Sequence, residues 1–205
     1  MSNLIHREST PVPPKEALVI LSSVLNELGL DEVLATNSVQ SLAQSLSVCC
    51  GDILLRQGEI QNHVFFVVSG ILKACHYSDN GSDLSKEFYF TNELCFLYSS
   101  WLTGQPAQYQ IEVLEDALIL QFPIRLLSQP KWQTVKIALL SQQLIYKEQK
   151  EAFLLLNTPE QRYRFLTEYR PNWVRQLNNI QLASYIGITP VSLSRLKSRP
   201  SNKAK

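Results

Sequence analysis

The sequence lacks the long apolar segments of membrane and secreted proteins. None of its apolar runs approaches the roughly 18 residues that a membrane span needs. The first ten residues contain no apolar stretch like that of a secretory signal. With 205 residues, of which 45% are hydrophobic and 18% charged, the chain can still bury a sizeable core. We therefore expect a globular cytoplasmic protein without a membrane partner.

Cysteine is scarce and shows no metal-site spacing. Cys49 and Cys50 are adjacent, which makes them poor partners for an ordinary disulfide, and Cys75 and Cys95 lie farther along the chain. Because the chain is expected in the cytoplasm, we interpret all four as buried, reduced thiols.

Histidine is scarce too. His6, His63 and His76 do not cluster in the sequence. A jelly-roll enzyme such as a cupin holds its metal with a closely spaced set of two histidines and a glutamate. The sequence supplies no such set, so we predict a protein that is not an enzyme, with no catalytic residues and no metal site.

Charge is unevenly distributed along the chain. Residues 1–158 contain 10 Lys and Arg against 16 Asp and Glu, whereas residues 159–205 contain 9 against 2. A short basic segment after an acidic body indicates that the end of the chain meets a polyanion. The alternative is a solvated basic tail, and charge alone does not decide between them.

Short apolar runs alternate with turn-forming residues between Val48 and Phe122. Evenly spaced short strands of this kind predict an antiparallel sandwich or barrel. Gly70 separates two of the runs, 64–68 and 71–74, and is expected to separate two strands. Residues 14–29, in front of this region, have the apolar stripe of a helix. The expected fold class is α+β, with an antiparallel jelly-roll-like β-roll and flanking helices.

A seven-residue apolar period begins after Pro130. Two rows three residues apart form the seam of a paired helix, so we predict a long dimerisation helix, the alternative being an ordinary core helix. A second stripe of Ile137, Ala138, Leu140 and Leu144 is expected to pack on the chain's own body. The predicted dimer interface consists of Trp132, Val135, Leu139, Gln142, Tyr146, Gln149, Phe153 and Leu156.

Residues 181–199 have the pattern of a helix-turn-helix. Ala183 is the small residue where the helices cross, and Gly187, four positions on, suits the left-handed turn. Thr189 is placed to cap the second helix. The alternative is an accidental helical hairpin. Side chains that would lock the two helices together are Leu182, Ile186, Ile188, Leu193 and Leu196.

The second helix of this pattern presents one polar, basic face. Ser192, Arg195 and Arg199 recur at spacings of three and four, and such groups suit base edges and phosphates in a major groove. Double-stranded DNA is therefore the expected partner. The predicted DNA-binding residues are Gln181, Thr189, Ser192, Arg195, Lys197 and Arg199.

The chain resembles the Crp/Fnr superfamily of bacterial transcription regulators. Three stretches, 51–59 (GDILLRQGE), 65–70 (FFVVSG) and 158–162 (TPEQR), are similar to family signatures. The resemblance implies a cyclic-nucleotide-binding-like β-roll, a homodimer that reads a near-palindromic operator, and RNA polymerase as a further partner. It gives three segments: residues 1–127 with the β-roll, 128–157 with the dimerisation helix, and 158–205 with the DNA-binding domain. Within the last, Thr158 is the expected N-cap of the first helix, with Gln161 completing a capping box.

The chain departs from the family where relatives hold cyclic AMP. Those relatives use Gly-Glu and then Arg-Ser, and the matching pairs here are Phe96-Leu97 and Ala107-Gln108. No Arg or Lys occurs between Lys86 and Arg125, so a phosphate would lack its cation. We predict a degenerate pocket that does not bind cyclic AMP. It is either filled by its own side chains or open to an unknown apolar or neutral effector.

The other sensor groups of the family are not expected either. An iron–sulfur sensor needs a cluster of N-terminal cysteines, and no cysteine precedes Cys49. Haem would need an axial ligand from Cys75, His76 or Cys95. We predict no cofactor.

The reading helix also departs from the family. Arg195 matches the base-reading arginine of relatives, whereas Val191 stands where many relatives carry a glutamate that reads cytosine. The carboxylate readout is thus missing, and a contact with a thymine methyl group becomes an option. The remaining alternative for the whole chain is a ligand-binding or protein-interaction module of the same fold that does not bind DNA.

Overall fold

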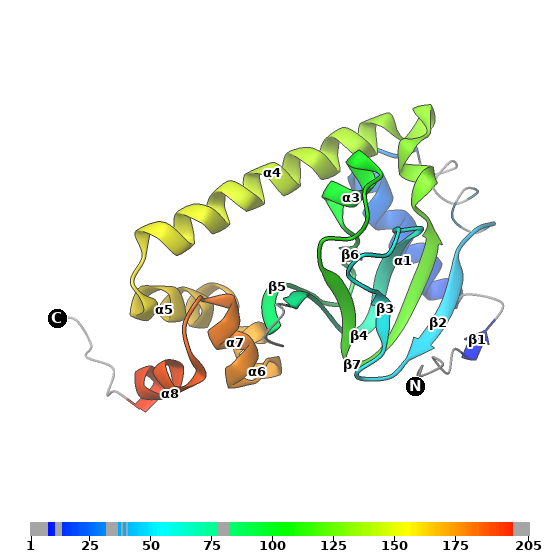
Figure 1. Ribbon diagram of the computed structural model, residues 1–205. Helices are drawn as coiled ribbons and strands as arrows, with labels where there is room; N and C mark the ends of the chain where they lie inside the picture. The colour runs from blue at the N-terminus through cyan, green and yellow to red at the C-terminus, as the bar shows by residue number, and fades with distance from the viewer. Residues whose placement is uncertain are drawn as a thin grey trace. The chain divides into compact units, whose positions relative to one another are not determined.

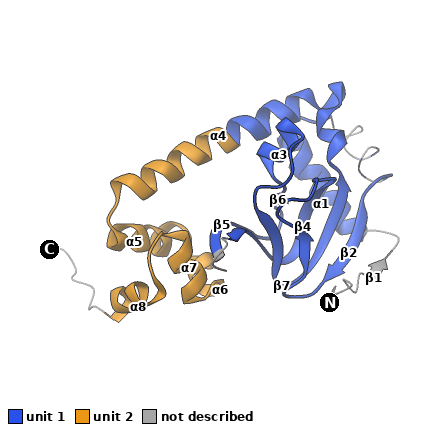
Figure 2. Cartoon of the chain, in the orientation of Figure 1, with its two compact units in different colours: residues 1–142 blue, residues 143–205 orange. Residues whose placement is uncertain are grey.

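The computed structural model describes residues 8–10, 14–31, 37, 39, 41–77 and 83–198. It divides the chain into unit 1, residues 1–142, and unit 2, residues 143–205 (Figure 2). The division falls inside the long helix α4 (Gln133–Leu156), not at the expected breaks after residues 127 and 157. The first turns of α4 belong to unit 1 because they carry part of its core.

Unit 1 is built on an antiparallel sheet, as predicted (Figure 1). Its main path runs β1-β2-β7-β4-β5, with β3 paired to β7 and β6 paired to β4. Every pair is antiparallel, which suits short strands joined by turns. The strands are β1 (Glu8–Thr10), β2 (Gln44–Val48), β3 (Ile53–Leu55), β4 (His63–Tyr77), β5 (Asp83–Tyr89), β6 (Leu94–Cys95) and β7 (Gln110–Pro123).

Alternation along β4 places apolar side chains on both faces of the sheet. Val64 and Phe66 join one core cluster, while Phe65 and Val67 join a second. Successive side chains of a strand point to opposite faces, so four consecutive apolar residues need cover on both sides. The first cluster packs under α1 (Lys15–Glu27) and the start of α4, and the second lies among β2, β3, β4 and β7.

Gly70 does not separate two strands, contrary to the sequence-based prediction. β4 continues through it, and the register with β7 shifts between Val67 and Leu72. Gly70 has φ +84°, and a Cβ there would lie 2.4 Å from the Asp116 carbonyl oxygen. Glycine therefore permits a bulge and a close backbone approach within a single long strand.

Up to residue 198, unit 2 consists of the rest of α4 and four shorter helices. These are α5 (Pro159–Tyr169), α6 (Pro171–Gln176), α7 (Asn179–Tyr185) and α8 (Pro190–Ser198). α5 begins with the predicted capping box: the Gln161 amide donates to Thr158 Oγ1, and the Thr158 amide donates to the Gln161 side chain. Both bonds satisfy N–H groups that the first turn of a helix leaves without partners.

The prediction of four buried thiols is half wrong. Cys75 and Cys95 are buried, but Cys49 and Cys50 are exposed in the turn after β2. The turn is held by Asp52 and Asp116, whose carboxylates accept from the Cys49 and Cys50 amides. The two bonds hold the backbone in a surface turn, so both thiols are exposed.

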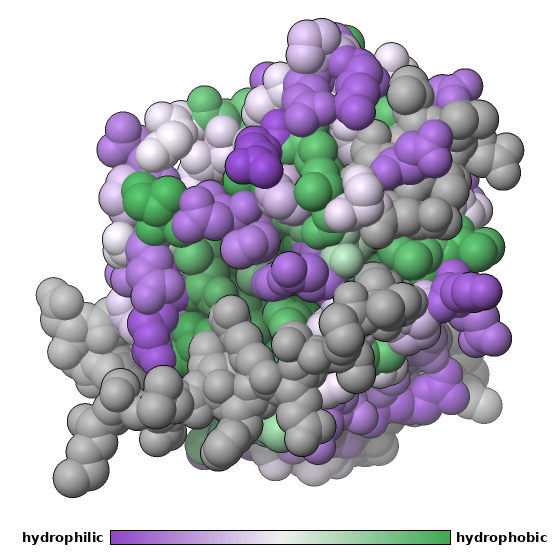
Figure 3. Space-filling view, turned by 90° about the vertical axis from the view of Figure 1, so that its right-hand side faces the viewer, coloured by the Kyte–Doolittle hydropathy of each residue, from purple (hydrophilic) through white to green (hydrophobic). Residues whose placement is uncertain are grey.

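The surface mixes polar and apolar residues. Figure 3 views unit 1 from the side that carries β2, where apolar side chains reach the surface among hydrophilic ones. In the described part of the chain, no helix combines the length and the apolar character needed to cross a membrane.

Candidate nucleic-acid interface and effector region

The α7–α8 pair, residues 179–198, is locked by apolar residues at the predicted positions. Leu182, Ala183 and Ile186 on the first side and Leu193 on the second are fully buried. Gly187 in the turn has φ +70°, a conformation that favours glycine. The amide of Ile188 donates to the Ala183 carbonyl at 2.9 Å and closes the turn. The pair is thus a fixed unit with one side available to a partner.

Residues of helices α4 and α5 contact the α7–α8 pair and its turn. The Arg162 guanidinium on α5 donates to the carbonyl oxygens of Asn157 and Ile186, so it ties the start of α5 to the turn. On α4, the Tyr146 hydroxyl lies 3.1 Å from that of Tyr185, and the Lys150 ammonium lies 4.0 Å from the centre of the same ring. Neither residue pair was singled out from the sequence, because the partners are 24 to 39 positions apart.

The outward side of α8 carries polar and basic groups. Thr189 accepts from the Ser192 amide at 3.1 Å, which confirms its predicted role as the helix cap. Ser192, Ser194 and Arg195 are exposed, as is Val191 with 60% of its surface accessible. Exposed side chains on the first turns of a helix are those that reach base edges in a major groove.

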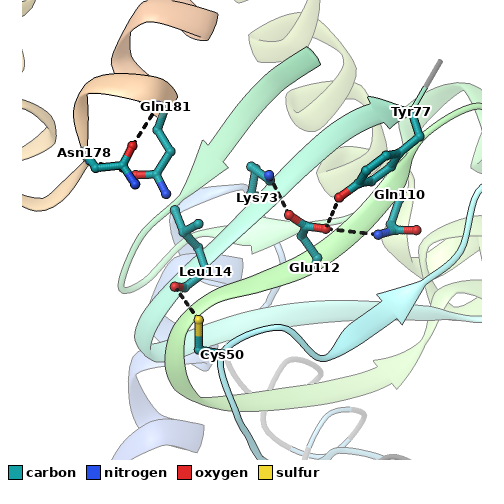
Figure 4. A network of polar contacts seen from close by, with 8 residues as sticks. All are labelled: Cys50, Lys73, Tyr77, Gln110, Glu112, Leu114, Asn178 and Gln181. Atoms are coloured by element: carbon teal, nitrogen blue, oxygen red, sulfur yellow. Dashed lines mark hydrogen bonds and ion pairs between the residues drawn. The ribbon is translucent and has the colours of Figure 1, made fainter. Parts of the chain in front are cut away.

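Besides Thr189 and Ser192, whose hydroxyl oxygens lie 2.9 Å apart, three predicted DNA-binding residues have other contacts or fall outside the described residues. The Lys197 ammonium donates to Asn179 Oδ1 at 2.6 Å, at the start of α7. The Gln181 side chain accepts from the Asn178 amide in the capping box of α7 (Figure 4). Arg199 lies outside the described residues. The structure therefore keeps Ser192 and Arg195 on the outward side, bonds Lys197 to the start of α7 and engages the Gln181 side chain in the cap of α7.

The predicted dimer rows need correction. Trp132, Val135 and Leu139 are at most 3% exposed and belong to the core of unit 1. Within unit 2, Tyr146 contacts Tyr185, and the Phe153 ring lies 5.3 Å from Phe165. These five residues pack within their own unit, whereas Gln142, Gln149 and Leu156 of the predicted rows are exposed. A heptad pattern indicates that one side of a helix is buried, but not whether a second copy or the chain's own body buries it.

The opposite side of α4 is the uncovered one. Ile137, Leu144 and Leu155 are 56%, 61% and 73% exposed, and Ile145 and Leu156 flank them at 57% and 80%. Ile137 and Leu144 belong to the stripe that was expected to pack on the chain's own body, whereas Ala138 of the same stripe does pack against the core of unit 1. Glu148 and Glu151 interrupt the exposed row in the second half of the helix.

Segment 92–109 contains the residues predicted to replace a cyclic-nucleotide site. Phe96 and Leu97 are fully buried, in the first and second core clusters respectively, and Ala107 is 3% exposed. The Phe96 ring packs 4.3 Å from Tyr98 and 5.6 Å from Trp101, in the short helix α3 (Tyr98–Thr103). Gln108 is exposed. Apolar side chains thus occupy the positions that align with the Gly-Glu pair and the arginine.

Backbone groups of this segment already have partners within unit 1. The buried Gln61 side chain accepts from the Leu97 amide at 2.6 Å and donates to the Leu97 carbonyl at 3.1 Å. The Ala107 amide donates to the Glu59 carbonyl, and the Ala107 carbonyl accepts from the Gly58 amide. An anion would have to displace these bonds before it could use the amides of Leu97 and Ala107.

The fold brings two polar residues of β4 and β5 to Tyr109, which sequence reasoning missed. The Lys86 ammonium lies 3.7 Å from the centre of the Tyr109 ring, and the His76 ring lies 5.2 Å from it. Burial and the nearby Lys86 charge lower the pKa of His76 below its ordinary value. A cation therefore lies beside segment 92–109 after all, stacked on an aromatic ring.

A polar network crosses β4 and β7 on the sheet face opposite the second core cluster (Figure 4). The Lys73 ammonium lies 2.5 Å from Glu112 Oε1, with side chains 6% and 15% exposed. Tyr77 and Gln110 both donate to Glu112 Oε2 at 3.0 Å. Burial alone would raise the pKa of Glu112, but the bonds from Lys73, Tyr77 and Gln110 outweigh it and lower that pKa.

Metal-ligating side chains do not cluster in the described part of the chain. Among the described residues, no group of three or more His, Cys, Asp and Glu side chains is placed to hold a metal ion. Burial raises the pKa of the Cys95 thiol well above its ordinary value, so it stays protonated.

Comparison with known proteins supports the resemblance seen in the sequence. Residues 45–129 match the cyclic nucleotide-binding domain family. No curated protein matches the sequence as a whole.

Solved structures extend the likeness to the whole fold. FixK2 from Bradyrhizobium japonicum superimposes with a TM-score of 0.63 at 16% identity, over 77% of this chain and 83% of its own. The catabolite activator protein of Thermus thermophilus gives 0.52 at 19%, over 85% and 84%. The sensor domain of the transcriptional regulator DNR from Pseudomonas aeruginosa gives 0.53 at 17%, over 67% and 89%. At these identities the likeness establishes the fold.

Proposed function

We propose that this chain, a Crp/Fnr-type protein in fold with a cyclic nucleotide-binding domain at residues 45–129, is a dimeric DNA-binding transcription regulator. The α7–α8 pair is then its helix-turn-helix, and α8 is the helix that enters the major groove. The protein acts in the cytoplasm and has no catalytic reaction of its own.

One observation carries this proposal: the exposed side of α8. Ser192 and Arg195 face outward, while Leu193 between them is fully buried against α7. The side chains that could read bases are therefore held by a rigid support. Residues 159–205 also carry 9 basic against 2 acidic residues, which favours a polyanionic partner.

A second copy of the chain would complete the regulator. The exposed row of Ile137, Leu144 and Leu155 runs along one side of α4, opposite the side that packs on the chain's own core. A pair of such helices buries both rows, and two α8 helices then read two half-sites about one DNA turn apart, roughly 10 base pairs. Leu144→Glu should shift the protein to monomer in sedimentation velocity, whereas Gln142→Glu, off this row, should leave the dimer intact.

We propose that this chain has lost the cyclic-nucleotide site of the family. The position of the phosphate-binding arginine is the buried Ala107, and its backbone groups bond to Gly58 and Glu59. A cyclic phosphate would lose its charge-assisted partner there. Isothermal titration with cyclic AMP should give no binding, and a micromolar dissociation constant would overturn this part of the proposal.

Fluorescence anisotropy tests DNA binding itself. The probe is a labelled duplex selected by the full chain from a random library, titrated at 50 and 200 mM salt. We expect affinity to fall about a thousandfold or more with salt, because phosphate contacts release counterions. Cyclic AMP should not change the result. Failure to enrich any duplex, or an affinity indifferent to salt, would favour the protein-interaction module instead.

A further inference from the structure

We infer that Val191 is a specificity-determining residue, which reads the 5-methyl group of a thymine in each half-site. The inference rests on the proposed function and deepens it, since it names a base that α8 selects.

Val191 combines high exposure with a position on the reading side of α8. It is 60% exposed, although valine is among the residues most often buried in folded proteins. It stands in the first turn of the helix, directly after Pro190. Leu193, two positions on, is the residue that packs inward. Val191 is therefore an apolar side chain that the helix presents rather than buries.

The neighbours of Val191 determine what it can contact. Ser194 and Arg195 lie three and four residues farther along, so the three side chains share one side of the helix. Arg195 suits the O6 and N7 atoms of guanine, and thymine is the base that offers an apolar group in the major groove. Val191 has no polar atom on its side chain, so the methyl group is the feature it can recognise.

The helix geometry limits where this thymine lies. Four residues of α-helix rise about 6 Å, less than the height of two stacked base pairs at 3.4 Å each. The thymine that Val191 contacts should therefore lie within about two base pairs of the guanine read by Arg195.

Replacing thymine by uracil isolates this contact, because uracil lacks only the methyl group. Each thymine of the selected duplex is replaced in turn in both half-sites, and affinity is measured by anisotropy at constant salt. At one position, replacing thymine by uracil should lower the affinity of the wild type about fourfold per half-site. This is the effect expected for losing the burial of roughly one methyl-sized group. For Val191→Ala the penalty at that position should vanish, and Val191→Thr, which keeps a methyl group, should restore part of it.

The matched control is Ile180→Ala, which removes another exposed apolar side chain, 66% accessible, from α7. It should leave the uracil penalty unchanged. A second readout is a new selection with Val191→Glu, which should replace the thymine by cytosine, since a carboxylate accepts from cytosine N4. Circular dichroism checks that each variant folds.

The outcomes separate this inference from the proposed function. If the wild type binds its duplex but no uracil weakens it, or the penalty is the same with alanine at position 191, the methyl readout is wrong and DNA binding stands. If the wild type selects no duplex, the proposed function fails and the inference fails with it.

Discussion

Segment 92–109 and the α7–α8 pair use their polar groups in opposite ways. In the segment, the amides of Leu97 and Ala107 bond to Gln61 and Glu59, and the side chains at these positions are buried. In the pair, the capping bonds lie at the helix starts, and Ser192 and Arg195 face outward. Segment 92–109 uses its polar groups in internal hydrogen bonds, whereas the α7–α8 pair leaves polar side chains exposed to a partner.

Under the proposed function, this difference favours DNA binding by α8 over cyclic AMP binding by segment 92–109. A ligand gains little where it must first break internal hydrogen bonds and displace packed rings, because those losses offset the new contacts. Exposed groups on a rigid helix have no such cost. Under the proposed function, cyclic AMP would then not control DNA binding.

The largest expected effect tests whether the polar groups inside unit 1 are structural. Lys73→Met removes the countercharge of the Glu112 carboxylate, whose side chain is 15% exposed, and leaves it only the bonds from Tyr77 and Gln110. We expect the free energy of unfolding in urea to fall by about 3–5 kcal/mol, as for other broken buried pairs. The double variant Lys73→Met with Glu112→Leu should recover most of the loss, and exposed Lys15→Met should change little.

Lowering the pH should weaken the contribution of the same pair to stability. The pKa of Glu112 is lower in the folded than in the unfolded chain, so its charge stabilises the fold above the ordinary carboxyl range. That contribution is lost as pH falls through the folded pKa. Glu112→Gln should therefore lose part of the acid sensitivity between about pH 5 and 3, measured by urea unfolding at each pH. An identical pH profile in both proteins would contradict this account.

A smaller loss of stability should follow when the hydrogen bonds between Gln61 and segment 92–109 are removed. Gln61→Ala removes both bonds to the Leu97 backbone and leaves the buried Leu97 amide without a partner, while the Leu97 carbonyl still accepts from the Trp101 amide. We expect about 1–3 kcal/mol of destabilisation. The neighbouring exposed Asn62→Ala serves as the control. If Gln61→Ala were as stable as the control, the segment would not depend on internal bonds.

Arg195→Ala should affect binding and leave stability alone. The exposed guanidinium should contribute about 1–3 kcal/mol to affinity for the selected duplex, with relaxed selectivity at one base position. Arg125→Ala removes the same charge from unit 1 and should leave the selectivity intact. Unfolding of both variants should match the wild type, since both residues are exposed.

The smallest effect concerns the cap of α8. Thr189→Ala removes the oxygen that accepts from the Ser192 amide, which should destabilise unit 2 by about 1 kcal/mol. Thermal unfolding of Thr189→Ala and Thr189→Ser distinguishes the cap from the side chain's bulk, because serine keeps the hydroxyl. Equal melting temperatures for the alanine and serine variants would speak against a capping role.

Local signals in the sequence predicted local structure well. Thr158 with Gln161, Thr189, Gly187 and Ala183 all do what their spacing indicated, because caps and tight turns are decided within a few residues. The antiparallel sheet followed from short apolar runs between turn-forming residues in the same way.

Partners distant in sequence were the part that local patterns did not predict. The sequence showed two apolar stripes on α4 but not which one meets the core, and Gly70 as a bulge depends on its approach to Asp116. Likewise, Lys86 reaches Tyr109 although 22 intervening positions separate them.

By itself the sequence determined the element types, the caps, the basic end of the chain and the loss of the Gly-Glu and Arg-Ser pairs. These depend on residue type and short spacing. Only the tertiary structure decided which side of α4 stays uncovered, that Gln61 closes segment 92–109 and that Lys73 pairs with Glu112. Each of these depends on segments that are distant in the sequence, so it is fixed by how whole faces and loops pack and not by any neighbour along the chain.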